Sequence, residues 1–179
     1  RPIVFGNNDT PGVMLSSAAK EYLKVYGVLV GRNPLIFTNN DSGYETAIEF
    51  KKNGIDSVIL DTRKDPQSEI VDEAKNLGID IKFSYVVVAA KGYKKVKSAD
   101  IAKISDDKEK LGVLENIKCD CICVSGFWTP TIHLASQSGN KTKFNENIDA
   151  FVPGISKQNE TTLGAANGTY TLDETLKTS

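Results

Sequence analysis

Leu35-Ile-Phe37-Thr-Asn-Asn-Asp-Ser-Gly43 is a short apolar run that breaks into a polar turn. Apolar residues then recur with helical spacing from Tyr44 to Phe50, and this periodicity stops at Asn53-Gly54. Ser57-Val-Ile-Leu-Asp61 follows as a second apolar run, which is typical of a buried strand. Strand, turn, helix and strand within about thirty residues form a βαβ unit, and its crossover length favours parallel pairing of the two strands.

Further elements extend this unit in both directions. The sequence predicts helices over 13–26, 68–77 and 171–177, strands over 79–83 and 119–124, and a β-hairpin of 85–90 and 94–104 around Gly92. Residues 108–116 are polar and indicate an edge turn, and residues 126–160 are polar and loop-rich. We therefore expect the α/β class: a Rossmann-like parallel sheet flanked by helices, with a small antiparallel β-hairpin.

Composition excludes several classes of protein. The chain has 179 residues, 40% of them hydrophobic, and its 22 basic and 23 acidic residues leave a net charge of −1. This balance excludes a disordered chain, and it lacks the basic surplus of a nucleic-acid binder. The apolar runs are too short to cross a membrane and no signal peptide is present, so we expect a cytoplasmic location with no nucleic-acid or membrane partner. Since the first residue is Arg1, we also expect a piece of a longer chain.

The polar turn occupies the place of a dinucleotide-binding motif. In that G-x-G-x-x-G motif the glycines let the backbone approach a pyrophosphate at the helix N-terminus. Here only the last glycine, Gly43, is present, and it is the one that lets helix and strand pack closely. Asp41 adds a negative charge where the phosphate would lie. The alternative interpretation is that Asp41 and Ser42 simply cap the helix.

Asp61 ends the second predicted strand, at the position where an acidic side chain binds adenosine ribose in dinucleotide-binding proteins. Strand ends also carry Asp for turn formation, so this residue alone is a weak signal. The candidate cofactor-binding residues of this region are Thr38, Asn39, Asn40, Asp41, Gly43 and Asp61. Because the motif has lost two glycines, we expect weak NAD binding or none.

Cys119, Cys121 and Cys123 alternate along a predicted strand. We expect buried, reduced thiols that share one face of that strand, because alternate residues point the same way. A metal or redox site is the alternative, but the spacing does not match known zinc sites, so no metal ligand is assigned. His133 lies in a polar loop without an adjacent nucleophile, and we assign no catalytic residue.

Four lysines cluster around the predicted hairpin, at positions 91, 94, 95 and 97. Charged edges discourage unwanted strand pairing, and this is the interpretation we favour. An acidic partner surface is the alternative.

Several motifs distributed over the whole chain together resemble a known family, the alpha subunit of heterotetrameric sarcosine oxidase. They are Arg1-Pro-Ile-Val-Phe5, Asn8-Asp9, Pro11-Gly-Val-Met-Leu15, Phe37-Thr-Asn-Asn-Asp-Ser42, Val124-Ser-Gly126, Trp128-Thr-Pro130, His133-Leu134, Ser136-Gln-Ser-Gly139, Phe151-Val-Pro-Gly154 and Gly164-Ala-Ala-Asn-Gly168. The resemblance implies two interleaved dinucleotide domains, of which the first holds NAD. It implies that residues 31–125 form an inserted Rossmann-like domain, and that residues 1–30 and 126–179 belong to the first domain.

The same resemblance implies the activity and the partners of a whole enzyme. That enzyme oxidatively demethylates sarcosine to glycine on a flavin (FAD or FMN) held mainly by the beta subunit, forms peroxide, and uses tetrahydrofolate. Its partners are the remaining domains of the same subunit and the beta, gamma and delta subunits. Gly164 and Asn167 match the place where reductases of this fold carry a Gly-Asp pair that contacts flavin. This region would itself be non-catalytic.

Two other functions remain open from the sequence. One is the insert domain of an amino-acid dehydrogenase alpha subunit, which would bind ATP or NAD(H). The other is a module that docks partner subunits and binds no ligand.

Overall fold

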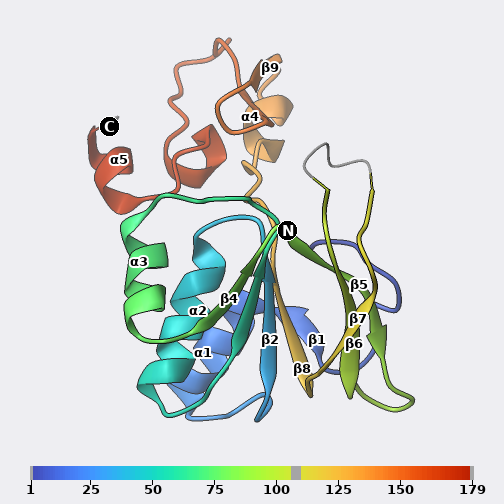
Figure 1. The fold of residues 1–179 in the computed structure, drawn as a ribbon. Helices are drawn as coiled ribbons and strands as arrows, with labels where there is room; N and C mark the ends of the chain where they lie inside the picture. The colour runs from blue at the N-terminus through green and yellow to red at the C-terminus, as the bar shows by residue number, and fades with distance from the viewer. Residues whose placement is uncertain (1, 106–109, 178–179) are drawn as a thin grey trace. The chain divides into compact units, whose positions relative to one another are not determined.

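A five-stranded parallel sheet forms the centre of the computed structural model, which describes residues 2–105 and 110–177 (Figure 1). Its strand order is β1-β8-β2-β3-β4. The strands are β1 (Val13–Leu15), β8 (Cys121–Ser125), β2 (Pro34–Thr38), β3 (Val58–Asp61) and β4 (Asp80–Phe83). Every neighbouring pair is parallel, with Phe37 beside both Leu60 and Val124. The predicted βαβ unit and its parallel pairing are thereby confirmed.

Helices cover one face of this sheet (Figure 1). They are α1 (Ser16–Tyr26), α2 (Ser42–Lys52) and α3 (Glu69–Asn76). Ile36 and Ile59 point from the sheet into a buried cluster that also contains Ala47 and Phe50 of α2 and Val71 of α3. The helices stay on this face because their apolar residues recur every three or four positions.

A second, antiparallel sheet covers the opposite face. Its order is β5-β6-β7, from β5 (Tyr85–Lys91), β6 (Ser98–Lys103) and β7 (Glu115–Lys118). Leu35, Phe37 and Leu60 pack in one buried cluster with Val87 and Ile101 of this second sheet. The result is three layers: helices, parallel sheet and antiparallel sheet. Since β2 is buried on both faces, its run of apolar residues is continuous rather than alternating.

The predicted hairpin around Gly92 is confirmed, but it is part of a larger sheet. We expected an edge turn over 108–116, and that expectation is wrong for residues 115 and 116, which belong to β7. Asn116 pairs with Asp100 and its side chain donates to the Asp100 carboxylate at 2.8 Å. Residues 106–109 lie outside the described part of the chain.

The predicted helix over 13–26 is correct only from Ser16 onward. Its first three residues form β1, because Val13, Met14 and Leu15 pair with β8 at the edge of the sheet. The predicted end is confirmed: Gly27 takes φ +63° and its N–H donates to the Leu23 carbonyl, as in a helix C-cap.

The chain divides into two compact units, one ending at Phe127 and the other beginning at Trp128. The first unit includes β1 and α1, which lie within residues 1–30. The assignment of those residues to a separate dinucleotide domain stays a prediction about a larger protein. The second unit contains α4 (His133–Gln137), β9 (Thr142–Asn145), β10 (Ala150–Pro153), the 3-10 helix η1 (Gly164–Asn167) and α5 (Leu172–Lys177).

The antiparallel pair β9 and β10 lies in the region expected to be loop-rich. Phe144 and Phe151 on this pair meet edge to face, with ring centroids 5.3 Å apart. The predicted short helix over 171–177 is confirmed as α5.

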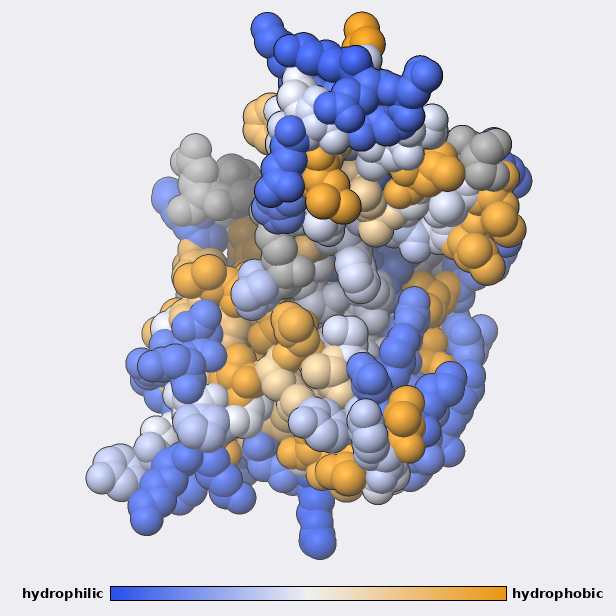
Figure 2. Space-filling model, turned by 180° about the vertical axis from the view of Figure 1, so that it is seen from behind, coloured by the Kyte–Doolittle hydropathy of each residue, from blue (hydrophilic) through white to orange (hydrophobic). Residues whose placement is uncertain are grey.

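Hydrophobic side chains are exposed along α1 and the segment that follows it, including Tyr22, Val25, Tyr26, Val28 and Leu29. Figure 2, which views the molecule from behind, shows hydrophobic residues mixed with hydrophilic ones rather than a uniformly apolar face. Among the described helices, none combines the length and the apolar character that crossing a bilayer requires.

The three cysteines are buried and reduced, as expected, but they do not share one face. Cys121 and Cys123 face the helices, with their sulfur atoms 3.6 Å apart, whereas Cys119 packs in the cluster on the other side. The reason is that β8 begins only at Cys121. Before it, the Asp120 carboxylate accepts hydrogen bonds from the backbone N–H groups of Arg32 and Asn33, which breaks the alternation.

Gly43 allows α2 to pack closely against β2. A Cβ atom at this position would lie 2.6 Å from Cβ and 2.7 Å from Oγ1 of Thr38, which is itself fully buried. The sequence expectation that this glycine serves helix–strand packing therefore has a direct steric basis.

We expect Gly43→Ala to lower the free energy of unfolding by about 1–3 kcal/mol, as overpacking of a well-filled core does. Urea denaturation followed by circular dichroism measures this change. The matched control is Gly112→Ala, since its nearest neighbour would be 3.4 Å from the new Cβ. Equal stability of the two variants would contradict the steric argument.

Candidate functional site

The carboxyl ends of β2, β3 and β8 meet at the position where nucleotides bind in open α/β sheets. From β2 the chain continues to β3 and β4 on one side, whereas β8 returns on the other side. This reversal makes the space between β2 and β8 the topological switch point. The turn over 38–43 leads from β2 into α2 at this place.

The Asn40 side chain fills this switch point. Its Oδ1 accepts hydrogen bonds from the Ser42 N–H at 3.0 Å and from the Ser42 hydroxyl at 2.6 Å. Its Nδ2 donates to the carbonyl oxygens of Ser125 at 3.2 Å and Gly126 at 2.8 Å, at the end of β8. Asn40 therefore caps α2 and ties its start to β8. The interpretation that Asp41 caps this helix is wrong, because its side chain makes no capping hydrogen bond.

Thr38 and Asn39 reinforce the same connection. The Thr38 hydroxyl is buried and lies 2.7 Å from the Asn40 carbonyl and 3.2 Å from the Ser125 carbonyl, both of which can accept its proton. Asn39 donates its backbone N–H to Ser125 and accepts from the Asn40 amide at 2.9 Å. The polar atoms of this turn thus bind one another, and the Ser42 N–H at the start of α2 is already occupied.

Asp61 is fully buried and its carboxylate is engaged on both oxygens. It accepts hydrogen bonds from the Tyr44 hydroxyl at 2.7 Å, from the Arg63 backbone N–H at 2.9 Å, and from the Arg63 guanidinium at 2.8 Å. Arg63 also contacts Asp41 at 2.8 Å, so one guanidinium bridges two carboxylates. A ribose hydroxyl would have to displace one of these donors.

Burial and hydrogen bonding shift the pKa values of the two donors to Asp61, Tyr44 and Arg63. Burial raises the pKa of the Tyr44 phenol, and the hydrogen bond to Asp61 raises it further, so this hydroxyl stays a proton donor. Burial of Arg63 lowers the pKa of its guanidinium, but the hydrogen bonds and charges of Asp61 and Asp41 outweigh this and raise it overall. The Arg63 guanidinium therefore stays protonated beside the two carboxylates.

A pocket of about 440 Å³ lies beside this network. Asn39, Arg63, Lys64 and Phe127 are among the residues that line it, together with Ser84. Ser84 takes a positive φ of 57° where β4 passes into β5. Asn39 was predicted from the sequence as a site residue, whereas Arg63 was not, because its only signal is its place two residues after Asp61.

Gly164 and Asn167 lie in η1 of the second compact unit, and the structure does not assign them to the unit that contains the turn. Gly164 takes φ +64°, and Asn167 is half-buried. Their expected contact with a flavin stays a prediction. Within the described residues, no group of three or more His, Cys, Asp or Glu side chains is placed to hold a metal ion.

Comparison with solved structures defines the class of fold. A thioredoxin reductase from Lactococcus lactis matches 94% of this chain and 55% of its own, with TM-score 0.68 and 14% identity. A flavoprotein disulfide reductase from Escherichia coli matches 98% of this chain and 38% of its own, with TM-score 0.65 and 16% identity. An L-proline dehydrogenase from P. horikoshii matches 92% of this chain and 27% of its own, with TM-score 0.54 and 21% identity. The chain therefore has the Rossmann-like fold of such oxidoreductases.

Sequence comparison finds similarity to the alpha subunits of sarcosine oxidases. The sarcosine oxidase subunit alpha of a Corynebacterium species is 33% identical over 99% of this chain, and that of Rhizobium meliloti is 36% identical over 93%. The predicted resemblance to this subunit is thus confirmed. The chain spans only 18% and 16% of the length of these two relatives. No protein-family model matches the chain.

We expect Tyr44→Phe to lower the free energy of unfolding at pH 7 by about 1–3 kcal/mol, because Asp61 loses a buried donor. The free energy of unfolding of the variant should also fall less at alkaline pH than that of the unsubstituted chain. The folded-state pKa of Tyr44 is raised, so its stabilisation is complete below about pH 10 and declines above it by about 1.4 kcal/mol per pH unit.

Urea titrations at pH 7 and at pH 10.5 measure both effects. Tyr93→Phe is the matched control, since Tyr93 is 91% exposed. An alkaline loss of stability in Tyr44→Phe equal to that of the unsubstituted chain would refute the role of this phenol.

Proposed function

We propose that this chain is a region of the alpha subunit of a sarcosine oxidase-type oxidoreductase. The observation that carries this proposal is the 33% identity to such a subunit over 99% of the chain. The Rossmann-like fold supports it, since reductases and dehydrogenases share that fold.

The role we propose for this region is structural rather than catalytic. Its best-placed polar groups bind one another: Asn40 binds Ser42 and Ser125, and Asp61 binds Tyr44 and Arg63. Residues 31–125 would form a domain inserted into a first dinucleotide domain, to which 1–30 and 126–179 return. NAD would be held in that first domain. Flavin, tetrahydrofolate and the beta, gamma and delta subunits would belong to the whole cytoplasmic enzyme.

The turn at the carboxyl edge does not fit a dinucleotide. A pyrophosphate needs free backbone N–H groups at a helix N-terminus and backbone approach through glycine. Here the Ser42 N–H is bound by Asn40, the Thr38 side chain fills the space beside Gly43, and the Asp41 carboxylate lies nearby. The Arg63 guanidinium, which could otherwise bind a phosphate at this edge, is already shared by Asp41 and Asp61.

We expect the chain to bind NAD, NADH and ATP with dissociation constants in the millimolar range or weaker. Each lost charge-assisted hydrogen bond to phosphate is worth about 1.5–3 kcal/mol, and two such losses move a micromolar site into that range. Isothermal titration calorimetry with each nucleotide measures this. Low-micromolar NAD affinity that is lost in Lys64→Ala and kept in the control Lys24→Ala would make the 440 Å³ pocket a working nucleotide site.

The activity is tested on the full-length protein that contains this chain, co-expressed with its partner subunits. Sarcosine should be oxidised with formation of peroxide, which a peroxidase-coupled assay records. Oxidation of proline, with no turnover of sarcosine, would instead support an amino-acid dehydrogenase. An assembly that contains flavin yet oxidises neither substrate would count against both assignments.

A further inference from the structure

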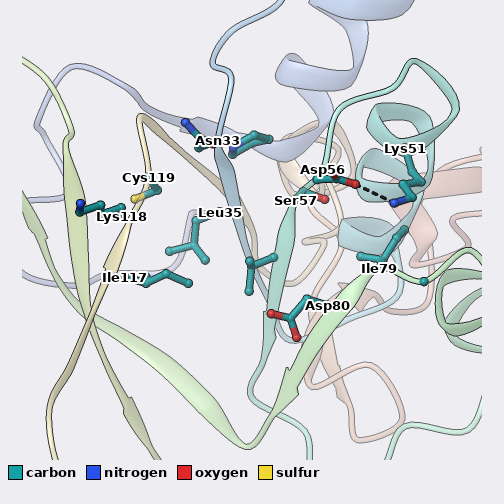
Figure 3. A pocket seen from close by; sticks show the side chains of 13 residues that line it. Asn33, Leu35, Lys51, Asp56, Ser57, Ile79, Asp80, Ile117, Lys118 and Cys119 are labelled. Atoms are coloured by element: carbon teal, nitrogen blue, oxygen red, sulfur yellow. Dashed lines mark hydrogen bonds and ion pairs between the residues drawn. The ribbon is translucent and has the colours of Figure 1, made fainter.

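A second pocket, of about 470 Å³, lies at the opposite, amino edge of the parallel sheet (Figure 3). The starts of β2, β3 and β4 form one side of it, and the end of β7 forms the other. It is far along the strands from the turn at residues 38–43. We propose that this pocket binds a small organic ammonium ion that carries an apolar body and a hydrogen-bonding oxygen. This proposal does not rest on the proposed function.

Within the described residues, an ion pair joins the side chains of β4 and β7 at one place along the strands. Lys82 of β4 reaches Glu115 of β7 at 3.9 Å, and the Tyr85 hydroxyl also donates to Glu115, at 3.0 Å. Alternate residues of a strand point to the same face. Asp80 and Ile117, two residues from Lys82 and Glu115, are therefore the next residues on these faces toward the amino edge. A carboxylate and an isoleucine cannot form an ion pair, and this place stays open.

The Asp80 carboxylate supplies the charge of the site. Figure 3 shows it directed into the space between its own strand and the side chains of Leu35 and Ile117. Asp80 is exposed at the start of β4, and within the described part of the chain its side chain makes no ion pair or hydrogen bond. Lys118 follows Ile117 but extends away from this space (Figure 3), so it does not neutralise Asp80 there. A cation is therefore the complementary ligand.

Apolar walls select an organic cation over a metal ion. Leu35, Val58 and Ile117 line the pocket next to Asp80. A metal ion needs several oxygen, nitrogen or sulfur ligands, and the described residues offer no such cluster. An ammonium group with an alkyl body instead places its charge on Asp80 and its carbon atoms against these walls.

Ser57 supplies a second polar contact. It is only 7% exposed, its hydroxyl has no hydrogen-bond partner in the described structure, and it lines the same pocket. Val58 pairs with Asp80, so Ser57 is one residue away from that pair at the start of β3. It faces the helix side, beside the ion pair of Lys51 and Asp56 (2.6 Å; Figure 3). An oxygen of the ligand that reaches around the sheet edge would satisfy this hydroxyl.

The test compares four small probes on the 179-residue chain by NMR chemical-shift titration. Valinol carries an amine and a hydroxyl, isoamylamine carries only the amine, isovalerate carries only a carboxylate, and valine carries both charges. We expect valinol to bind with a dissociation constant of about 1 mM, isoamylamine more weakly, and isovalerate not at all. Valine decides whether the oxygen function can be a carboxylate.

Two variants assign the contacts. Asp80→Asn should raise the dissociation constants of valinol and isoamylamine about tenfold or more. The control Asp72→Asn, on the surface of α3, should change neither constant. Ser57→Ala should weaken the binding of valinol but not that of isoamylamine, which has no oxygen. Thermal stability should not fall, because the substitution removes an unsatisfied buried hydroxyl.

Several outcomes would overturn the proposal. Binding of isovalerate as tight as that of valinol would show that the charge assignment is wrong. Unchanged valinol affinity in Asp80→Asn would show that this pocket is not an amine site. The same conclusion would follow if no probe changed any chemical shift at a concentration about 20 times the expected dissociation constant. Each of these results leaves the nucleotide and sarcosine experiments unaffected, so the two proposals fail separately.

Discussion

The buried carboxylate of Asp61 is the constraint on which the carboxyl edge of the sheet depends. An ionised carboxylate removed from water costs several kcal/mol unless charged and polar partners replace its hydration. Arg63 and Tyr44 are those partners, and they come from the loop after β3 and from α2. Since Arg63 also binds Asp41, the same ion pair fixes the turn that opens α2. A charge that a nucleotide-binding protein would offer to its ligand is here used to hold two elements together.

Much of this fold follows from local pattern. The apolar run of β2 and the helical spacing from Tyr44 to Phe50 suffice to predict the parallel unit, because burial on both faces leaves few other arrangements. Gly43 was predictable as a packing residue, since no larger side chain fits beside Thr38. The turn chemistry at Gly27 likewise marks the end of α1. Each of these features depends on residues that are close in the sequence.

The features that escaped prediction depend on distant contacts. β1 is only three residues long and is fixed by pairing with β8, more than a hundred residues later. Cys119 leaves the face of Cys121 because Asp120 binds the backbone ahead of β2. Asn40, rather than Asp41, caps α2, since its amide can also reach the end of β8. No periodicity or spacing within one segment carries this information.

The two edges of the parallel sheet therefore differ in what they leave unsatisfied. At the carboxyl edge, the polar groups that a dinucleotide would use are bound to one another, and a ligand would gain little there for the hydrogen bonds it disrupts. At the amino edge, the exposed Asp80 carboxylate and the buried Ser57 hydroxyl have no side-chain partner within the described residues, and an apolar wall lies beside them. A ligand oxygen would satisfy the desolvated Ser57 hydroxyl without breaking an existing hydrogen bond, so the amino edge is the stronger place to look for a ligand of this domain. Such a ligand would be cationic, the opposite in charge to the phosphates that this fold commonly holds.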